Sequence, residues 1–203
     1  MEQRKWLALA GIVSAVLLPL AIIVIAGSTP NDHASASKVM SFYSDNRGRN
    51  NLAAILVVIA AVLLVLFAAQ LRQALGGDHP AVLPRAAFGG LLVTAAGAGI
   101  SAAVHLALVD AVHYHLTSAA VTLNVLDNYA PVAIVTGFAA FGLAAGFSTL
   151  QRPAIPKWLG WAAIVFGVLS FLGPIGFIGL LLGLIWIIVV GVLLFRRDLQ
   201  PAA

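Results

Sequence analysis

Long apolar runs separated by short polar segments dominate the pattern of this chain. A helix of about 20 apolar residues, rising about 1.5 Å per residue, spans a hydrocarbon core of about 30 Å. The last two apolar runs meet at Gly173-Pro174, and one helix through both would be far longer than the core is thick, so we expect a hairpin there. The pattern predicts six membrane spans, at residues 6–26, 52–71, 86–109, 131–150, 158–172 and 175–195.

Two of the polar segments carry a helical periodicity of their own. Between the first two spans, Ala36, Val39, Met40 and Tyr43 recur at helical spacing with serines and a lysine between them. Residues 116–126, which lie between the third and fourth spans, are weakly amphipathic in the same way. Short amphipathic helices of this kind lie in the membrane interface. We therefore predict two short interfacial helices, both on the outer face of the bundle.

Composition supports a membrane protein. Hydrophobic residues make up 62% of the chain and charged residues only 9%, against about 25% charged in soluble domains. We therefore expect an all-α transmembrane helix bundle that forms a single domain over residues 1–203. The chain has no cysteine, which excludes disulfides, thiolate metal sites and cysteine nucleophiles. The first apolar run exceeds the roughly 7–15 residues of a signal-peptide core, so we interpret it as a retained span, with cleavage after Ala26 as the alternative.

The distribution of Lys and Arg predicts the orientation. With both termini in the cytoplasm, eight basic residues fall inside and three fall outside, as the positive-inside rule requires. This predicts a multi-pass protein of the bacterial cytoplasmic (inner) membrane. The net charge of +4 does not indicate nucleic-acid binding, because the chain has no basic patch with interleaved aromatic residues. The inside set is Arg4, Lys5, Arg72, Arg85, Arg152, Lys157, Arg196 and Arg197, and the outside set is Lys38, Arg47 and Arg49.

The segment from His105 to Pro131 concentrates the polar chemistry of the chain. It holds three of the five histidines and contains no Lys or Arg. His105 falls about one helical turn before the predicted end of the third span. It is therefore either an interfacial histidine bonded to a loop carbonyl or part of an outer-face pocket for a lipid, a quinone or a tetrapyrrole. The residues expected to ring such a pocket are His105, Asp110, Asn124, Asp127 and Tyr129.

His113 and His115 suggest a metal site on the outer face. On a helix, residues two apart point about 200° apart and cannot chelate one ion, whereas on an extended segment they share a face. A metal site there requires the segment around Tyr114 to be non-helical and requires help from another ligand such as Asp110, His33 or Asp127. The alternative is an ordinary solvated loop.

Signals for catalysis and coupled transport are missing from the sequence. None of the predicted spans contains an Asp, Glu, Lys or Arg, although intramembrane proton and ion relays usually depend on such residues. No metalloprotease, nucleophile-elbow, P-loop or dinucleotide-binding motif occurs. The leading interpretation is a non-enzymatic structural or interaction protein that contacts the lipid bilayer and a protein partner or a second copy. A ligand-binding protein and an outer-face metal-binding protein are the alternatives, with the cofactor unknown.

Small residues spaced for close helix contact are present in two spans. They are Gly142 and Gly146 in the fourth span and Gly179 and Gly183 in the sixth. Residues of this type let helix backbones approach closely in membranes. We expect them to pack helices within the chain, with dimerisation as the alternative.

Three stretches resemble those of an uncharacterised family. They are SKVMSFYSDNRGRN before the second span, LDNYAPVAIVTGFAAFGLAAGFSTL, and PAIPKWLGWAAIVFGVLSFLGP before the final hairpin. Their order is similar to that in a family of six-helix bacterial integral membrane proteins, common in actinobacteria and classed as a domain of unknown function. The resemblance covers most of the chain and implies a six-helix membrane fold. It implies no activity, cofactor or functional residue.

Overall fold

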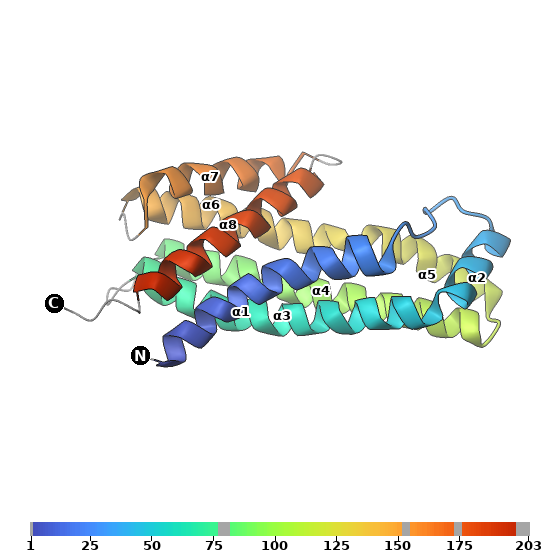
Figure 1. Ribbon diagram of the computed structural model, residues 1–203. Coiled ribbons are helices and arrows are strands. Elements are labelled where there is room, and N and C mark those ends of the chain that lie inside the picture. Colours follow the sequence, from blue (N-terminus) through green and yellow to red (C-terminus); the bar gives the residue numbers. More distant parts are fainter. Residues whose placement is uncertain (1, 77–81, 152–154, 173–175, 198–203) are drawn as a thin grey trace.

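The computed structural model describes residues 2–76, 82–151, 155–172 and 176–197, and every regular element in these ranges is helical (Figure 1). The predicted all-helical architecture is confirmed for this part of the chain. The predicted turn at Gly173-Pro174 and the basic residue Arg152 lie outside the described residues. The elements are α1 (Glu2–Pro19), the π-helix η1 (Leu20–Ala26), α2 (Ala36–Asp45), α3 (Arg47–Gly76), α4 (Val82–His113), α5 (Thr117–Tyr129), α6 (Pro131–Gln151), α7 (Lys157–Leu169) and α8 (Gly176–Arg197).

The longer helices form a closed ring in chain order. α1 packs on α3, α3 on α4, α4 on α6, α6 on α7 and α7 on α8, and α8 returns to pack on α1. The short helices α2 and α5 lie against each other at the end of the bundle opposite the two termini (Figure 1). This arrangement places the segments with the most polar side chains together at one end of the ring.

Glycines allow the tightest helix contacts in the ring. A Cβ atom on Gly137 of α6 would lie 2.4 Å from the backbone nitrogen of Thr94 and 2.7 Å from the carbonyl oxygen of Gly90, both in α4. The backbones of α4 and α6 are therefore in direct contact, as small residues permit in membrane bundles. The small-residue pairs singled out in the sequence are also used within the chain: Gly142 contacts α7, and Gly183 contacts the ring of Phe138.

The exterior of the ring is apolar. Large hydrophobic side chains are exposed on α1, α3, α4, α7 and α8, for example Val62, Ile100 and Ile185. Among the described residues, five helices are long and apolar enough to cross a membrane. α7, with 13 residues, is about 20 Å long and is shorter than this requirement. The helices also differ in extent from the predicted spans, because α3 begins at Arg47, α4 continues to His113 and α7 ends at Leu169.

The short length of α7 leaves the ring incomplete at the end that carries α2 and α5. α4 is 32 residues long, about 48 Å, so its last turns extend well beyond α7. α8 starts at Gly176 and packs on α1, but its first turns diverge from η1, as Figure 1 shows. The space between η1, α6 and the start of α8 is therefore not filled by another of the described helices.

Candidate functional site

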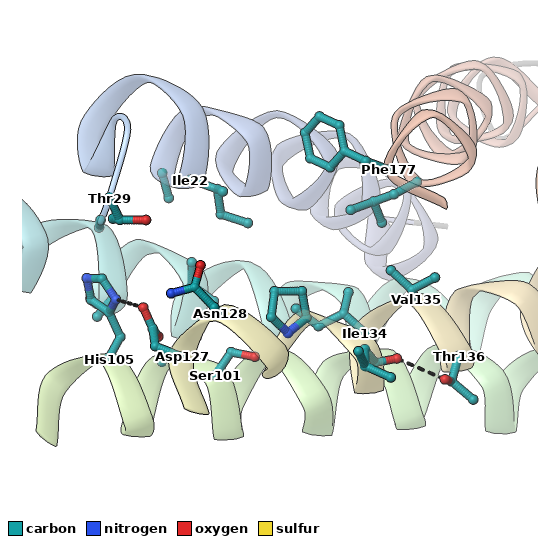
Figure 2. A pocket seen from close by; sticks show the side chains of 18 of the residues that line it. Ile22, Thr29, Ser101, His105, Asp127, Asn128, Ile134, Val135, Thr136 and Phe177 are labelled. Carbon is teal, nitrogen blue, oxygen red and sulfur yellow. Dashed lines mark hydrogen bonds and ion pairs between the residues drawn. The ribbon is translucent and has the colours of Figure 1, made fainter. Parts of the chain in front are cut away.

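A pocket of about 650 Å³ occupies this unfilled part of the bundle (Figure 2). Side chains from η1, α3, α4, α5, α6 and α8 line it, together with Ser170 and Phe171 after α7. Most of the polar residues gather at one end, and the rest of the wall is mainly apolar. Its polar members are Thr136 and Ser170, whose hydroxyls donate to backbone carbonyl oxygens one turn earlier. The polar end comprises Thr29, Ser101, His105, Asp127 and Asn128, and the apolar wall includes Ile22, Val57, Ile134, Phe177 and Leu180.

Several apolar residues that line the pocket have exposed side chains. Ile22 of η1 and Phe177 of α8 both line it, and their side chains are 38% and 46% exposed. Figure 2 shows these two residues on the same side of the cavity, across from α4 and α6. Val132 and Phe171 also line the pocket and are each 62% exposed. The pocket therefore borders a mainly apolar surface, which suits hydrocarbon better than water.

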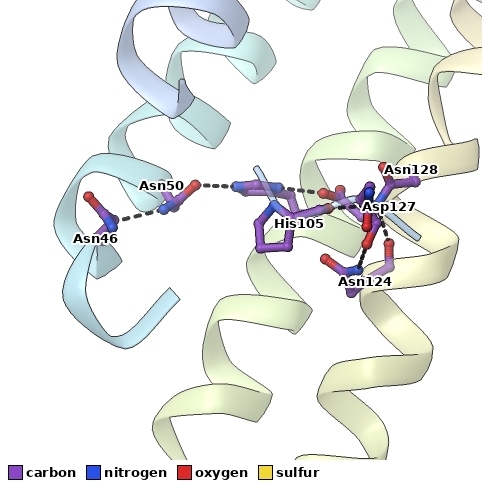
Figure 3. Close-up of polar contacts among 8 residues, drawn as sticks. Asn46, Asn50, His105, Asn124, Asp127 and Asn128 are labelled. Atoms are coloured by element: carbon purple, nitrogen blue, oxygen red, sulfur yellow. Dashed lines mark hydrogen bonds and ion pairs between the residues drawn. The ribbon is translucent and has the colours of Figure 1, made fainter. Parts of the chain in front are cut away.

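A row of hydrogen-bonded side chains forms the polar end (Figure 3). Nδ1 of His105 lies 2.9 Å from Oδ2 of Asp127, and Nε2 lies 3.0 Å from Oδ1 of Asn50. The side chains of His105 and Asp127 are only 12% and 14% exposed. Three helices, α3, α4 and α5, thus meet through one imidazole ring.

The geometry determines how many protons this row holds. The Nδ2 atom of Asn50 donates to the carbonyl oxygen of Asn46 at 3.0 Å, so the Oδ1 atom faces His105 and must accept. Nε2 of His105 therefore carries a hydrogen. A second proton lies between Nδ1 and the carboxyl group of Asp127. The imidazole and the carboxyl group together hold two protons and have no net charge, either as an ion pair or as two neutral groups.

α5 holds the segment after η1 in place above the pocket. Asn124 donates to the carbonyl oxygen of Asn31 at 2.9 Å, and Asn128 donates to that of Pro30 at 3.1 Å. The hydroxyl of Tyr129 donates to Asp32 at 3.2 Å. These bonds fix the backbone beside Thr29, whose side chain lines the polar end.

Tyr43 of α2 is buried behind the histidine. Its ring meets that of His105 edge to face, with centroids 5.7 Å apart. Its hydroxyl is buried and has no partner in hydrogen-bonding geometry among the described residues, although the Thr29 side chain lies close enough to influence it. Burial, followed by the charge of Asp127, raises the pKa of Tyr43 well above its ordinary value of 10.0.

The structure places the predicted site residues in two groups. His105 and Asp127 come together and line the pocket, whereas Asn124 and Tyr129 hold the neighbouring segment. Asp110 lies elsewhere, with its carboxylate 3.7 Å from the guanidinium of Arg47. The sequence analysis missed Asn50, Tyr43, Thr29 and Asn128. A polar residue four positions after Asn46, at the start of a long apolar run, was the available signal for Asn50.

The two histidines of the suggested metal site lie apart from the pocket. His113 ends α4, and its Nδ1 accepts a hydrogen bond from Arg47 at 3.1 Å. His115 follows in a turn with a positive φ of 55°. Among the described residues, no group of three or more His, Cys, Asp or Glu side chains is placed to hold a metal ion. In the described residues, His113 and His115 therefore have no third side chain beside them that could complete a metal site.

Comparisons with protein-family models, with curated proteins and with solved structures found no match to this chain. The resemblance to the uncharacterised six-helix family therefore stays a prediction. The described residues form a ring of apolar helices that lines an amphipathic pocket. Its function has to be inferred from the chemistry of that pocket.

Proposed function

We propose that this chain is a six-span protein of the bacterial cytoplasmic membrane with both termini in the cytoplasm. The closed ring supports six spans, with α7 as the short member. Basic residues at the end carrying the termini, such as Lys5, Arg72 and Arg196, support the orientation by the positive-inside rule. α2 and α5 would then lie at the outer interface.

Single cysteines test this orientation, because the chain has none of its own. Ser41 on α2 and Ser118 on α5 are exposed at one end of the bundle, and Gln73 on α3 is exposed at the other. Cysteines at the first two positions should react with a membrane-impermeant maleimide in intact cells. One at Gln73 should react only after permeabilisation. Labelling of Gln73→Cys in intact cells would overturn the orientation.

We propose further that the protein binds an amphiphilic small molecule in the pocket. The observation that carries this proposal is the division of a cavity of about 650 Å³ into a polar end around His105 and Asp127 and a mainly apolar wall, which borders an exposed apolar surface. Binding pockets commonly measure about 300–1,000 Å³ and combine apolar walls with a few polar groups. This geometry favours ligand binding over a purely structural role.

The row of side chains also discriminates among the ligands considered from the sequence. A haem-type iron requires a ring nitrogen with a free lone pair, and both nitrogens of His105 are already hydrogen-bonded. A lipid or a quinone can bind without a free lone pair on His105. The proposal is therefore for a lipid-like or quinone-like molecule and against a tetrapyrrole.

A pocket-filling substitution tests the proposal. Ala54 of α3 lines the pocket and is 3% exposed, so Ala54→Phe would place a ring in the cavity. Val58 lies one turn further along the same helix and is 42% exposed, so Val58→Phe is the matched control. In native mass spectrometry, the wild-type protein and Val58→Phe should retain a bound amphiphile that Ala54→Phe has lost. Equal retention by all three proteins would refute binding in this pocket.

A further inference from the structure

The hydrogen-bond donors at the polar end of the pocket are already engaged. Both ring nitrogens of His105 are bonded, as described above. The side-chain nitrogen of Asn128 donates to the carbonyl oxygens of Pro30 and Asn124, at 3.1 and 2.8 Å. The hydroxyl of Ser101 donates to the Gly97 carbonyl oxygen of its own helix at 2.9 Å. Among the described side chains that line this end, the Thr29 hydroxyl is the remaining donor, and the Tyr43 hydroxyl competes for it.

Acceptors, in contrast, are left over. Asp127 uses Oδ2 for His105, and no described residue donates a hydrogen bond to its Oδ1 atom. The Oδ1 atom of Asn128 likewise receives no hydrogen bond from the described residues. Ser101 keeps lone pairs on its hydroxyl oxygen. The polar end therefore presents several acceptor oxygens and one hydroxyl to whatever enters.

We infer, on the basis of the proposed amphiphile-binding function, that the ligand has an uncharged head group that donates hydrogen bonds. The chemical class is an alcohol or phenol on an apolar tail, such as a hydroxylated lipid or a quinol. A hydroxyl satisfies the free oxygens of Asp127 and Asn128. A phosphate or carboxylate head brings mainly acceptors, so the free oxygens of Asp127 and Asn128 would be left unpaired.

The absence of net charge at the polar end disfavours the remaining class of donor. An ammonium head would be buried beside the His105–Asp127 pair, which has no net negative charge to balance it. A neutral hydroxyl head donates hydrogen bonds without adding a charge.

Matched probes test the inference in protein held in lipid nanodiscs. Dodecanol, dodecylamine and dodecyl phosphate share one apolar chain and differ in the head group. Their effect on the unfolding temperature is compared between the wild-type protein and Ala54→Phe, which corrects for changes in the bilayer itself. Dodecanol should raise the unfolding temperature of the wild-type protein and leave Ala54→Phe unchanged. The amine and the phosphate should affect the two proteins equally.

Two substitutions at the polar end sharpen the test. Asp127→Asn replaces an acceptor with a partial donor, and the affinity for dodecanol should fall about tenfold to a hundredfold. Ser101→Ala removes one acceptor and leaves the His105–Asp127 pair intact, so it keeps the test usable if Asp127→Asn fails to fold. It should weaken dodecanol binding severalfold.

The outcomes separate the two proposals. If dodecyl phosphate or dodecylamine stabilises the wild-type protein more than dodecanol does, and this preference is lost in Ala54→Phe, the pocket binds amphiphiles but the inference about the head group is wrong. If no probe distinguishes the wild-type protein from Ala54→Phe, the proposed binding function is itself overturned. Unchanged dodecanol affinity in both Asp127→Asn and Ser101→Ala would also contradict the inference.

Discussion

The contact between His105 and Asp127 should be the most sensitive polar interaction in the bundle. The perturbation is a double-mutant cycle made of His105→Leu, Asp127→Leu and the combined variant. The two side chains are 12% and 14% exposed, and their nearest atoms are 2.9 Å apart. At an effective dielectric constant of about 20, unit charges at this separation attract by about 6 kcal/mol, most of which offsets their removal from water.

The magnitude expected for each single variant follows from this balance. Removing one partner leaves the other largely buried and unpaired, which costs about 3–5 kcal/mol when the pair is ionised. His105→Leu also leaves Oδ1 of Asn50 without its donor. The combined variant removes both groups and should cost less than the sum of the single variants, with a coupling free energy of about 2 kcal/mol or more.

Equilibrium unfolding in mixed micelles measures these values, with the buried Trp186 as a fluorescence reporter. Trp186 donates to the carbonyl oxygen of Leu159 and packs against the rings of Phe141 and Phe166, so its signal reports unfolding of the packed helices. Single variants that each cost less than about 1 kcal/mol, with a coupling below about 0.5 kcal/mol, would refute a bonded pair shielded from water.

Three further predictions concern packing, alkaline stability and proton count. Gly137→Ala must move α4 and α6 apart by about 1 Å and should cost about 1–3 kcal/mol in unfolding free energy, whereas Gly99→Ala, with nothing within 4 Å, should be neutral or stabilising. Burial raises the pKa of Tyr43, so the folded state favours the neutral phenol. The stability that this contributes is fully present below about pH 10 and is lost as the pH rises further. The unfolding temperature of Tyr43→Phe should therefore decline less steeply at alkaline pH than that of the wild-type protein. In ¹⁵N NMR spectra, Nε2 of His105 should carry a hydrogen, and a bare Nε2 would contradict the hydrogen-bond assignment.

Much of the fold could be predicted because apolar runs directly reflect burial in hydrocarbon or in the core. The helical nature of the chain and the two amphipathic segments at α2 and α5 followed from periodicity alone. Helix ends were less predictable. α3 begins before its apolar run because Asn46 and Asn50 bond to backbone carbonyls one turn earlier, which lets the helix continue through polar residues.

The candidate site was only half visible in the sequence. His105 and Asp127 could be proposed because charged and polar residues are rare near apolar runs. Their pairing depends on how α5 folds back against α4, and Asn50 joins them from a helix 55 positions away in sequence. Such contacts leave no local pattern. Conversely, Asn124 and Tyr129 are residue types expected in a binding site, but they form hydrogen bonds to Asn31 and Asp32 in the segment after η1.

The π-helical turns of η1 make the pocket wall depend on chain length as well as on side-chain identity. Pro19 removes a backbone donor where α1 gives way to η1, and a π-helix bonds each residue to the fifth along instead of the fourth. The wider turns accommodate an additional residue, and two residues of this segment, Ala21 and Ile22, line the pocket. Deleting one residue here would restore α-helical winding and rotate those side chains out of the wall. Related chains that keep the pocket should therefore tolerate changes of residue type in this segment more readily than a change in its length.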